Sequence, residues 1–167
     1  SGAWMPAFIA GTTGMSLSQR MQSFELSENR NPYNTLEPGK RPRATLTPTI
    51  ALKNGKPYMA FGVQGGDGQE QWLLQFFLNI VEFGMDVQQA SEAANFESFG
   101  DHYSQPGRIV LRSDMNTLVL RTLIRMGYGL EFREKTSGPI TAILFNQDFG
   151  TMTGGASDFG DDTAMGF

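Results

Sequence analysis

The chain has 167 residues, which is long enough for one compact domain with a sizeable core. Its net charge of −4, its lack of cysteine and its single histidine, His102, argue against a nucleic-acid interface, disulfides, thiolate metal sites and histidine-centred catalysis. We therefore expect no metal, no cofactor and no nucleic-acid partner. No apolar stretch reaches the roughly 18 residues of a membrane span, so we expect no membrane segment either.

The first 43 residues predict little regular structure. Residues 1–26 are interpreted as short strands interrupted by the sequence AGTTG. Residues 27–43 are polar and contain several prolines, which is typical of a surface loop. The chain begins SGAWMPAF, without an initiator methionine or a signal-peptide pattern. We interpret Ser1 as a cut or cloning end and not as an N-terminal nucleophile.

The clearest local pattern is a β-hairpin. The sequences TIAL (49–52) and PYMAFGV (57–63) have the composition of strands. Between them, Asn54 and Gly55 supply the positive φ values that a tight hairpin turn needs.

A glycine loop and a helix follow the hairpin. The loop reads GVQGGDGQ (62–69), and after it apolar residues recur at three- and four-residue spacing up to Gly84. This spacing predicts a helix with a wide apolar face, ended by the glycine. The residues predicted to lie in the core are Trp72, Phe76 and Phe77.

The following segment predicts further helices and strands. Asp86 resembles an N-cap with Gln89 at the capping-box position of a short helix. Ser113 or Asp114 is expected to cap another helix that ends near Met126. The sequences RIVLR, YGLEFRE and TAILFN predict three more strands.

The tail, residues 150–167, shows neither a helical nor a strand period and is expected to be a loop. Asp158, Asp161 and Asp162 lack EF-hand spacing, so a solvated acidic tail is expected instead of a cation site. Over the whole chain, strands outnumber helices and hairpins precede helices. This order favours an α+β fold, with helices on one face of an antiparallel or mixed sheet, over alternating βαβ units.

The glycine loop admits three interpretations. A phosphate loop would need a lysine and a hydroxyl residue that are missing here, and Asp67 and Glu70 would repel a phosphate. Gly65 and Gly66 alternatively serve only to allow a sharp strand-to-helix turn. In the third interpretation their backbone N–H groups form an oxyanion hole at a helix N-terminus. The local pattern does not decide between the last two.

Several separated motifs occur in an order that resembles one family. They are GTTGMSLSQRMQSF (11–24), the segment from PGKRPRATLTPTI through the glycine loop (38–69), NIVEFGMDVQQASEAANF (79–96) and GGASDFGDD (154–162). Together they resemble the γ-glutamyltranspeptidase family over nearly the whole chain.

The resemblance implies an αββα layered sandwich of the N-terminal-nucleophile hydrolase type, of which this chain is the C-terminal part of a small subunit. It also implies a precursor that cuts itself, so that the freed N-terminal Thr attacks a γ-glutamyl amide while its own α-amino group acts as base. On the matching positions, Gly65 and Gly66 are the oxyanion-hole pair. Ala44 and Thr45 take the place of a Ser-Ser pair that contacts the substrate's α-carboxylate.

The match departs from the family pattern in two places. The catalytic Thr of the family lies upstream of the position that matches Ser1, so this chain by itself is expected to be inactive. The acidic residues that hold the substrate's α-ammonium fall on Arg20 and Ser23, and Ala44 replaces a hydroxyl, leaving Thr45. Arg20 either accepts a carboxylate or is an exposed surface residue. We therefore expect an acylase-like or otherwise divergent branch.

Two functions remain open. In the first, the chain is part of an amidohydrolase or acyltransferase for a γ-glutamyl compound or another small amide, and its partner is the remainder of the precursor with the large subunit. The alternative is a catalytically silent binding or scaffold module, which the changes at Arg20, Ser23 and Ala44 favour. A chain without its partner strands is also expected to expose sheet edges or apolar surface and to self-associate.

Overall fold

The computed structural model of the chain describes residues 8–98, 107–159 and 163–165. Ser1, His102, Asp161 and Asp162, on which some of the predictions above rest, lie outside these residues. The chain divides into two compact units, residues 1–45 and 46–167, and each is described by itself.

The described part of the first unit contains two short 3₁₀ helices, Arg20–Ser23 and Pro32–Asn34. The predicted short strands are not formed between residues 8 and 26, where the strand-like pairing is limited to two isolated bridges, Ile9 with Ser16 and Glu25 with Thr35. The reason is that Gly11 and Gly14 adopt φ values of +54° and +71°, which turn the chain instead of extending it.

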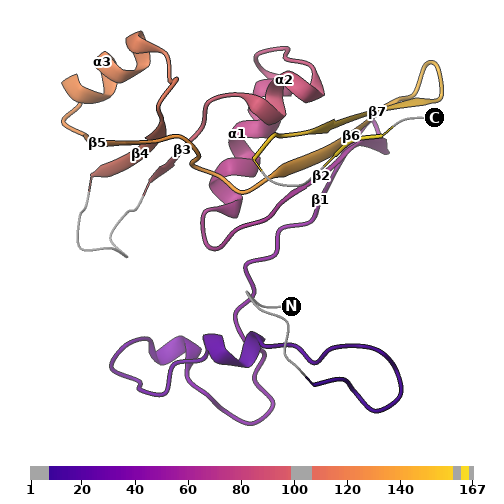
Figure 1. Cartoon of the computed structure of the whole chain (residues 1–167), viewed down its shortest axis with the longest axis vertical. Helices are drawn as coiled ribbons and strands as arrows, with labels where there is room; N and C mark the ends of the chain where they lie inside the picture. The colour runs from indigo at the N-terminus through magenta and orange to yellow at the C-terminus, as the bar shows by residue number, and fades with distance from the viewer. Residues whose placement is uncertain (1–7, 99–106, 160–162, 166–167) are drawn as a thin grey trace. The chain divides into compact units, whose positions relative to one another are not determined.

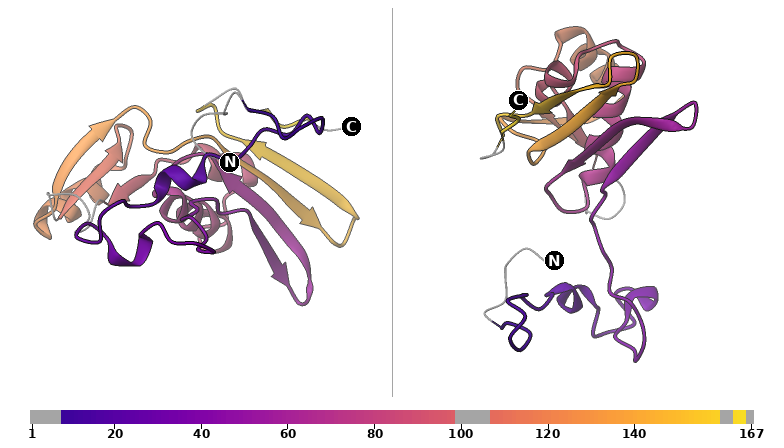
Figure 2. Two further views of the ribbon diagram at one scale, coloured as in Figure 1. Left: turned by 90° about the horizontal axis from the view of Figure 1, so that it is seen from below. Right: turned by 90° about the vertical axis from the view of Figure 1, so that its right-hand side faces the viewer.

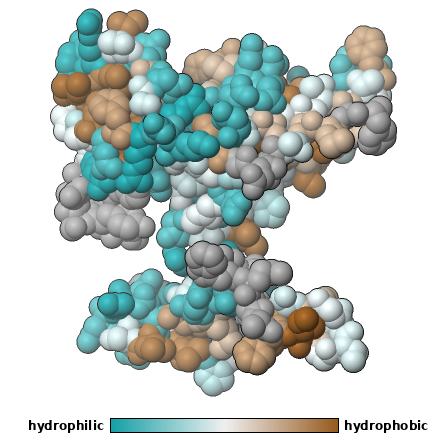
Figure 3. Space-filling model, viewed as in Figure 1, coloured by the Kyte–Doolittle hydropathy of each residue, from teal (hydrophilic) through white to brown (hydrophobic). Residues whose placement is uncertain are grey.

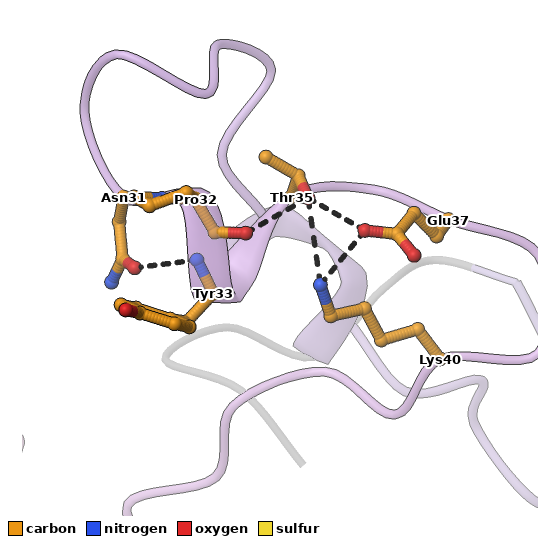
Figure 4. A network of polar contacts seen from close by, with 6 residues as sticks. All are labelled: Asn31, Pro32, Tyr33, Thr35, Glu37 and Lys40. Atoms are coloured by element: carbon orange, nitrogen blue, oxygen red, sulfur yellow. Dashed lines mark hydrogen bonds and ion pairs between the residues drawn. The ribbon is translucent and has the colours of Figure 1, made fainter.

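Polar contacts organise the predicted surface loop of this unit (Figure 4). The Thr35 hydroxyl donates to Oε1 of Glu37 over 2.8 Å, and Nζ of Lys40 lies 3.1 Å from the same oxygen. The hydrogen bond from Thr35 lowers the pKa of the Glu37 carboxyl, and the contact with Lys40 lowers it further. The loop is therefore held by its own side chains.

A four-stranded antiparallel sheet in the order β1-β2-β6-β7 forms the centre of the second unit. Its strands are Thr49–Lys53, Lys56–Val63, Ile140–Asn146 and Thr151–Ala156. The predicted hairpin is confirmed, with φ values of +54° at Asn54 and +76° at Gly55. The prediction of loop throughout 150–167 is wrong, because the edge strand β7 pairs with β6.

Two helices, α1 (Gln69–Val81) and α2 (Val87–Glu92), lie on one face of this sheet (Figures 1 and 2). The predicted capping box at the start of α2 is present, since Asp86 and Gln89 each accept from the other's backbone N–H. Between the helices and the sheet lies one apolar cluster. Its buried members are Met59, Phe61, Leu73, Phe76, Ile80, Val87, Ala90, Ile140 and Ala142, with Phe77 packed against them.

A second sheet has the order β3-β4-β5. Its strands are Phe96–Ser98, Arg108–Arg112 and Gly129–Arg133, and α3 spans Thr117–Arg125. Because β4 and β5 are parallel and α3 connects them, this region is a βαβ unit, which the strand order had not predicted.

The predicted cap of α3 is also wrong. The N-cap is Asn116, whose Oδ1 accepts from the backbone N–H of Leu118 over 2.8 Å. Asp114 is engaged elsewhere: both of its carboxylate oxygens contact the Arg112 guanidinium, at 2.6 and 2.5 Å. Asp114, one of the two predicted caps, therefore forms an ion pair with Arg112 instead of capping the helix.

The face of the four-stranded sheet opposite the helices carries exposed apolar side chains. Ile50, Leu52 and Met152 are 70%, 64% and 66% exposed. The expected apolar surface is thus present, and self-association remains a prediction. Within the described residues, no helix is long and apolar enough to cross a bilayer.

Candidate active site

The glycine loop connects β2 to α1 and presents two backbone amides. Gly65 and Gly66 are both exposed. Within residues 8–98, 107–159 and 163–165, neither of their N–H groups has a hydrogen-bond acceptor. The helix that follows adds the positive end of its dipole, and no side chain caps its N-terminus at Gly68. An oxygen that becomes negative would be stabilised at this place.

The indole ring of Trp72 explains why residues 65 and 68 of the loop are glycines. A Cβ on Gly65 would overlap Cζ3 of the ring, and a Cβ on Gly68 would lie 2.5 Å from Cζ2. A Cβ on Gly66 would meet nothing within 4 Å. Gly65 and Gly68 therefore pack against a buried aromatic ring, whereas the space around Gly66 is open.

A buried glutamine holds the loop from inside. Gln69 is only 2% exposed, and its Nε2 donates to the carbonyl oxygen of Gly65. Its Oε1 accepts from the hydroxyl of Thr47 over 3.1 Å. On the strand side, the backbone N–H of Gln64 donates to the carbonyl of Pro139 over 3.3 Å.

Carboxylates border the loop. Oε1 of Glu97 lies 2.7 Å from the position that a Cβ on Gly68 would occupy. Burial raises the pKa of the Glu97 carboxyl, Arg133 opposes this shift, and the nearby charge of Asp67 adds to it. Acidic groups so close to the loop agree with the rejection of a phosphate site.

The first unit contains the residues predicted to contact the substrate's amino-acid part. Nη2 of Arg20 donates to the hydroxyl of Thr45 over 3.3 Å. The hydroxyl of Ser23 donates to the carbonyls of Arg20 and Arg43 over 2.7 and 3.2 Å. Ala44 is exposed. Arg20, Ser23 and Thr45 thus lie together in one polar cluster, and Arg20 is half-buried instead of fully solvated.

Sequence reasoning missed Gln69 as a site residue and assigned Trp72 to the core alone. The spacing contained a signal for the first, since Gln69 follows Gly65 by four residues and is polar at the start of an apolar helix face. In the described part of the chain, no group of three or more His, Cys, Asp or Glu side chains is arranged to hold a metal ion.

Comparison with known proteins identifies relatives of the whole segment. A family model for γ-glutamyltranspeptidase matches residues 6–167. The glutathione hydrolase-like YwrD proenzyme of Bacillus subtilis (strain 168) is 32% identical over 166 residues, which cover 96% of this chain and 30% of the relative. The acylase ACY 1 proenzyme of Pseudomonas sp. (strain SE83) is 30% identical over 153 residues, which cover 92% of this chain and 26% of the relative. The chain thus spans less than a third of the length of these relatives.

A solved structure shows the same fold. The γ-glutamyltranspeptidase of Pseudomonas nitroreducens superimposes with a TM-score of 0.76 at 21% identity, covering 96% of this chain and 86% of that chain. The predicted α+β architecture of the N-terminal-nucleophile hydrolase type is therefore confirmed, with one helix layer and its sheet visible in the second unit. The fold and the family match lead to the same conclusion: the chain belongs to the γ-glutamyltranspeptidase family.

Proposed function

We propose that this chain supplies the oxyanion-stabilising loop of an amidohydrolase or acyltransferase that cleaves γ-glutamyl or related amides. One observation carries the proposal. The Gly65 and Gly66 N–H groups are exposed at the N-terminus of α1 and have no acceptor in the described part of the chain. Backbone donors of this kind are each worth about 10²–10³ in kcat when they face a developing oxyanion.

The proposed reaction uses a nucleophile from the remainder of the precursor. The hydroxyl of an N-terminal Thr attacks the amide carbonyl while its α-amino group takes the hydroxyl proton. The carbonyl oxygen becomes negative and accepts from Gly65 and Gly66. The C–N bond then breaks, the proton passes to the leaving amine, and an acyl-enzyme remains. Water or an amine subsequently takes the acyl group.

The polar cluster of the first unit suggests which acyl group is accepted. Arg20 occupies the position where the family holds an ammonium, and it donates to the hydroxyl of Thr45. A guanidinium repels an ammonium and pairs readily with a carboxylate. We therefore propose that the acyl group carries a terminal carboxylate and does not need an α-ammonium.

Two chromogenic anilides test both proposals in the full-length protein. γ-Glutamyl-4-nitroanilide and glutaryl-4-nitroanilide differ only in the α-ammonium group. We expect self-cleavage of the precursor, seen by mass spectrometry, and a kcat/KM for the glutaryl compound at least equal to that for the γ-glutamyl compound. A clear preference for the γ-glutamyl compound would overturn the proposed role of Arg20.

A variant without the amide donor tests the loop itself. Gly66→Pro removes one N–H at a position with free space around Cβ, and we expect kcat to fall about 100-fold. Unchanged kcat would contradict the oxyanion role. A precursor that neither cleaves itself nor hydrolyses either anilide would support the alternative of a silent scaffold, which the replacement at Arg20 favours.

A further inference from the structure

The orientation of the peptide between Gly65 and Gly66 decides whether the loop can donate. In a trans peptide the C=O of one residue and the N–H of the next point to opposite sides of the chain. If the carbonyl of Gly65 faces inward, the N–H of Gly66 faces outward. Glycine has no Cβ to restrict such a peptide, so rotation of the whole unit meets little steric resistance. Something else must hold it.

The Gln69 side chain provides that hold. Its amide nitrogen donates to the carbonyl oxygen of Gly65, which draws this carbonyl toward α1. Its amide oxygen accepts from the hydroxyl of Thr47, so both ends of the amide are engaged. Because the side chain is almost completely buried, water cannot easily replace these hydrogen bonds, and breaking them would leave buried polar atoms unsatisfied at a cost in free energy.

Other neighbours restrict the loop but leave this peptide free. The ring of Trp72 blocks movement of Gly65 and Gly68 on one side. The hydrogen bond from Gln64 to Pro139 fixes the residue before them. Among these contacts, only the one from Gln69 reaches an atom of the peptide between Gly65 and Gly66.

We propose that Gln69 is a positioning residue, which holds the Gly65–Gly66 peptide with the Gly66 N–H pointing outward and never touches the substrate. This inference rests on the proposed oxyanion function of the loop. It predicts that loss of the Gln69 amide lowers kcat while the affinity for substrate is retained, because the donor acts mainly on the transition state.

The test compares two glutamines of the same helix in the full-length protein. Gln69→Met keeps the length of the side chain and removes the hydrogen bonds to Gly65 and Thr47. Gln75→Met is the matched control, since the Gln75 side chain bonds backbone atoms away from the loop, namely the Gln71 carbonyl at 2.9 Å and Phe96 N and O at 3.0 and 2.8 Å. We expect a 10- to 100-fold fall in kcat for Gln69→Met, roughly the loss of one misdirected donor, with KM changed less than about twofold. The control should retain its kcat.

A second variant and a structural measurement separate the possible failures. Gln69→Glu keeps the acceptor for Thr47 but, when ionised, cannot donate to Gly65, and it should lose kcat as Gln69→Met does. Crystal structures of both variants should show the Gly65–Gly66 peptide rotated or in two orientations. An unrotated peptide, or equal kcat losses in Gln69→Met and Gln75→Met, would overturn the inference. An inactive wild-type protein would instead refute the proposed function, while a rotated peptide would still establish what Gln69 holds.

Discussion

The two sheets of the second unit are covered to very different extents. α1 buries Leu73, Phe76 and Ile80 in the apolar cluster against the four-stranded sheet, and Trp72 under the glycine loop. By contrast, α3, beside the three-stranded sheet, has no buried residue. Leu118 and Ile124 of α3 are 70% and 61% exposed. Figure 3 shows apolar side chains on the surface of the part of the molecule that contains α3.

An open groove of about 630 Å³ lies between α1, the three-stranded sheet and α3. It is lined by Leu74 and Leu78 of α1, Phe96 and Ile109 of the three-stranded sheet, and Val119 of α3, among others. An amphipathic pattern is therefore enough to predict both helices, but it does not tell whether the apolar face will be covered. Since most helix stability in proteins comes from packing, the two helices should contribute very unequally to folding.

The largest expected effect tests this inequality directly. Phe76 is 1% exposed, and the centroid of its ring lies 5.3 Å from the centroid of the Phe61 ring. Phe76→Ala should lower the free energy of unfolding by about 3–5 kcal/mol, because it leaves a cavity in the core. Leu118→Ala, on the uncovered helix, should stay within about 0.5 kcal/mol of the wild type. Denaturant unfolding measures both. Similar losses in the two variants would mean that α3 is covered in solution.

A smaller effect concerns the contact between α1 and the three-stranded sheet. β3 is an edge strand, and its outward-facing backbone groups are met by Gln71 and Gln75 of α1. Gln71 exchanges hydrogen bonds of 2.8 and 3.0 Å with the backbone of Ser98, and Gln75 does the same with Phe96. The geometry fits because four residues of helix rise about 6 Å and two residues of strand about 6.6 Å.

Removing both glutamines should therefore loosen the three-stranded sheet selectively. For the double variant Gln71→Ala/Gln75→Ala we expect a loss of about 1–2 kcal/mol and faster amide exchange at Phe96 and Ser98. Gln147→Ala is the control, since it loses one exposed hydrogen bond to the Pro57 carbonyl in the other sheet. If exchange at Phe96 and Ser98 is no faster in the double variant, the glutamines do not hold the strand.

How much of this fold could be predicted depended on the range of the contacts. The hairpin was predictable because Asn54 and Gly55 determine it locally. β7 was missed because its sequence, TMTGGA, has no apolar alternation. Distant partners hold it instead: it pairs with β6, and both polar ends of the Gln88 side chain bond the backbone of Ala156, 68 residues away.

The candidate site shows the same limit. Gly65 and Gly66 could be singled out because glycine at a strand-to-helix junction is a local feature, but their predicted role as oxyanion donors came from the family resemblance and not from the local pattern. The contact of Trp72 with both ends of the loop could not, since a tryptophan at helical spacing predicts only a buried face. Likewise, nothing in the spacing indicated that Thr47 would complete the hydrogen bonding of Gln69.

The smallest expected effect concerns Glu97, which lies on β3 and whose carboxylate borders Gly68 of the glycine loop. Burial raises the pKa of this carboxyl above its ordinary value of 4.5, so the folded chain binds the proton more tightly than the unfolded chain does. The contribution of Glu97 to stability is therefore most favourable at acid pH. It is lost as the pH rises from the unfolded to the folded pKa.

Glu97→Gln should remove this pH dependence. Above the titration window the variant should be more stable than the wild type, by less than about 1 kcal/mol because the group is only half-buried. Below the window the two should unfold at the same temperature. Glu134→Gln, at an exposed glutamate, controls for the loss of one negative charge from a chain of net charge −4. A stability gain that is equal in both variants, or equal at all pH values, would show that Glu97 is solvated and does not couple the three-stranded sheet to the glycine loop.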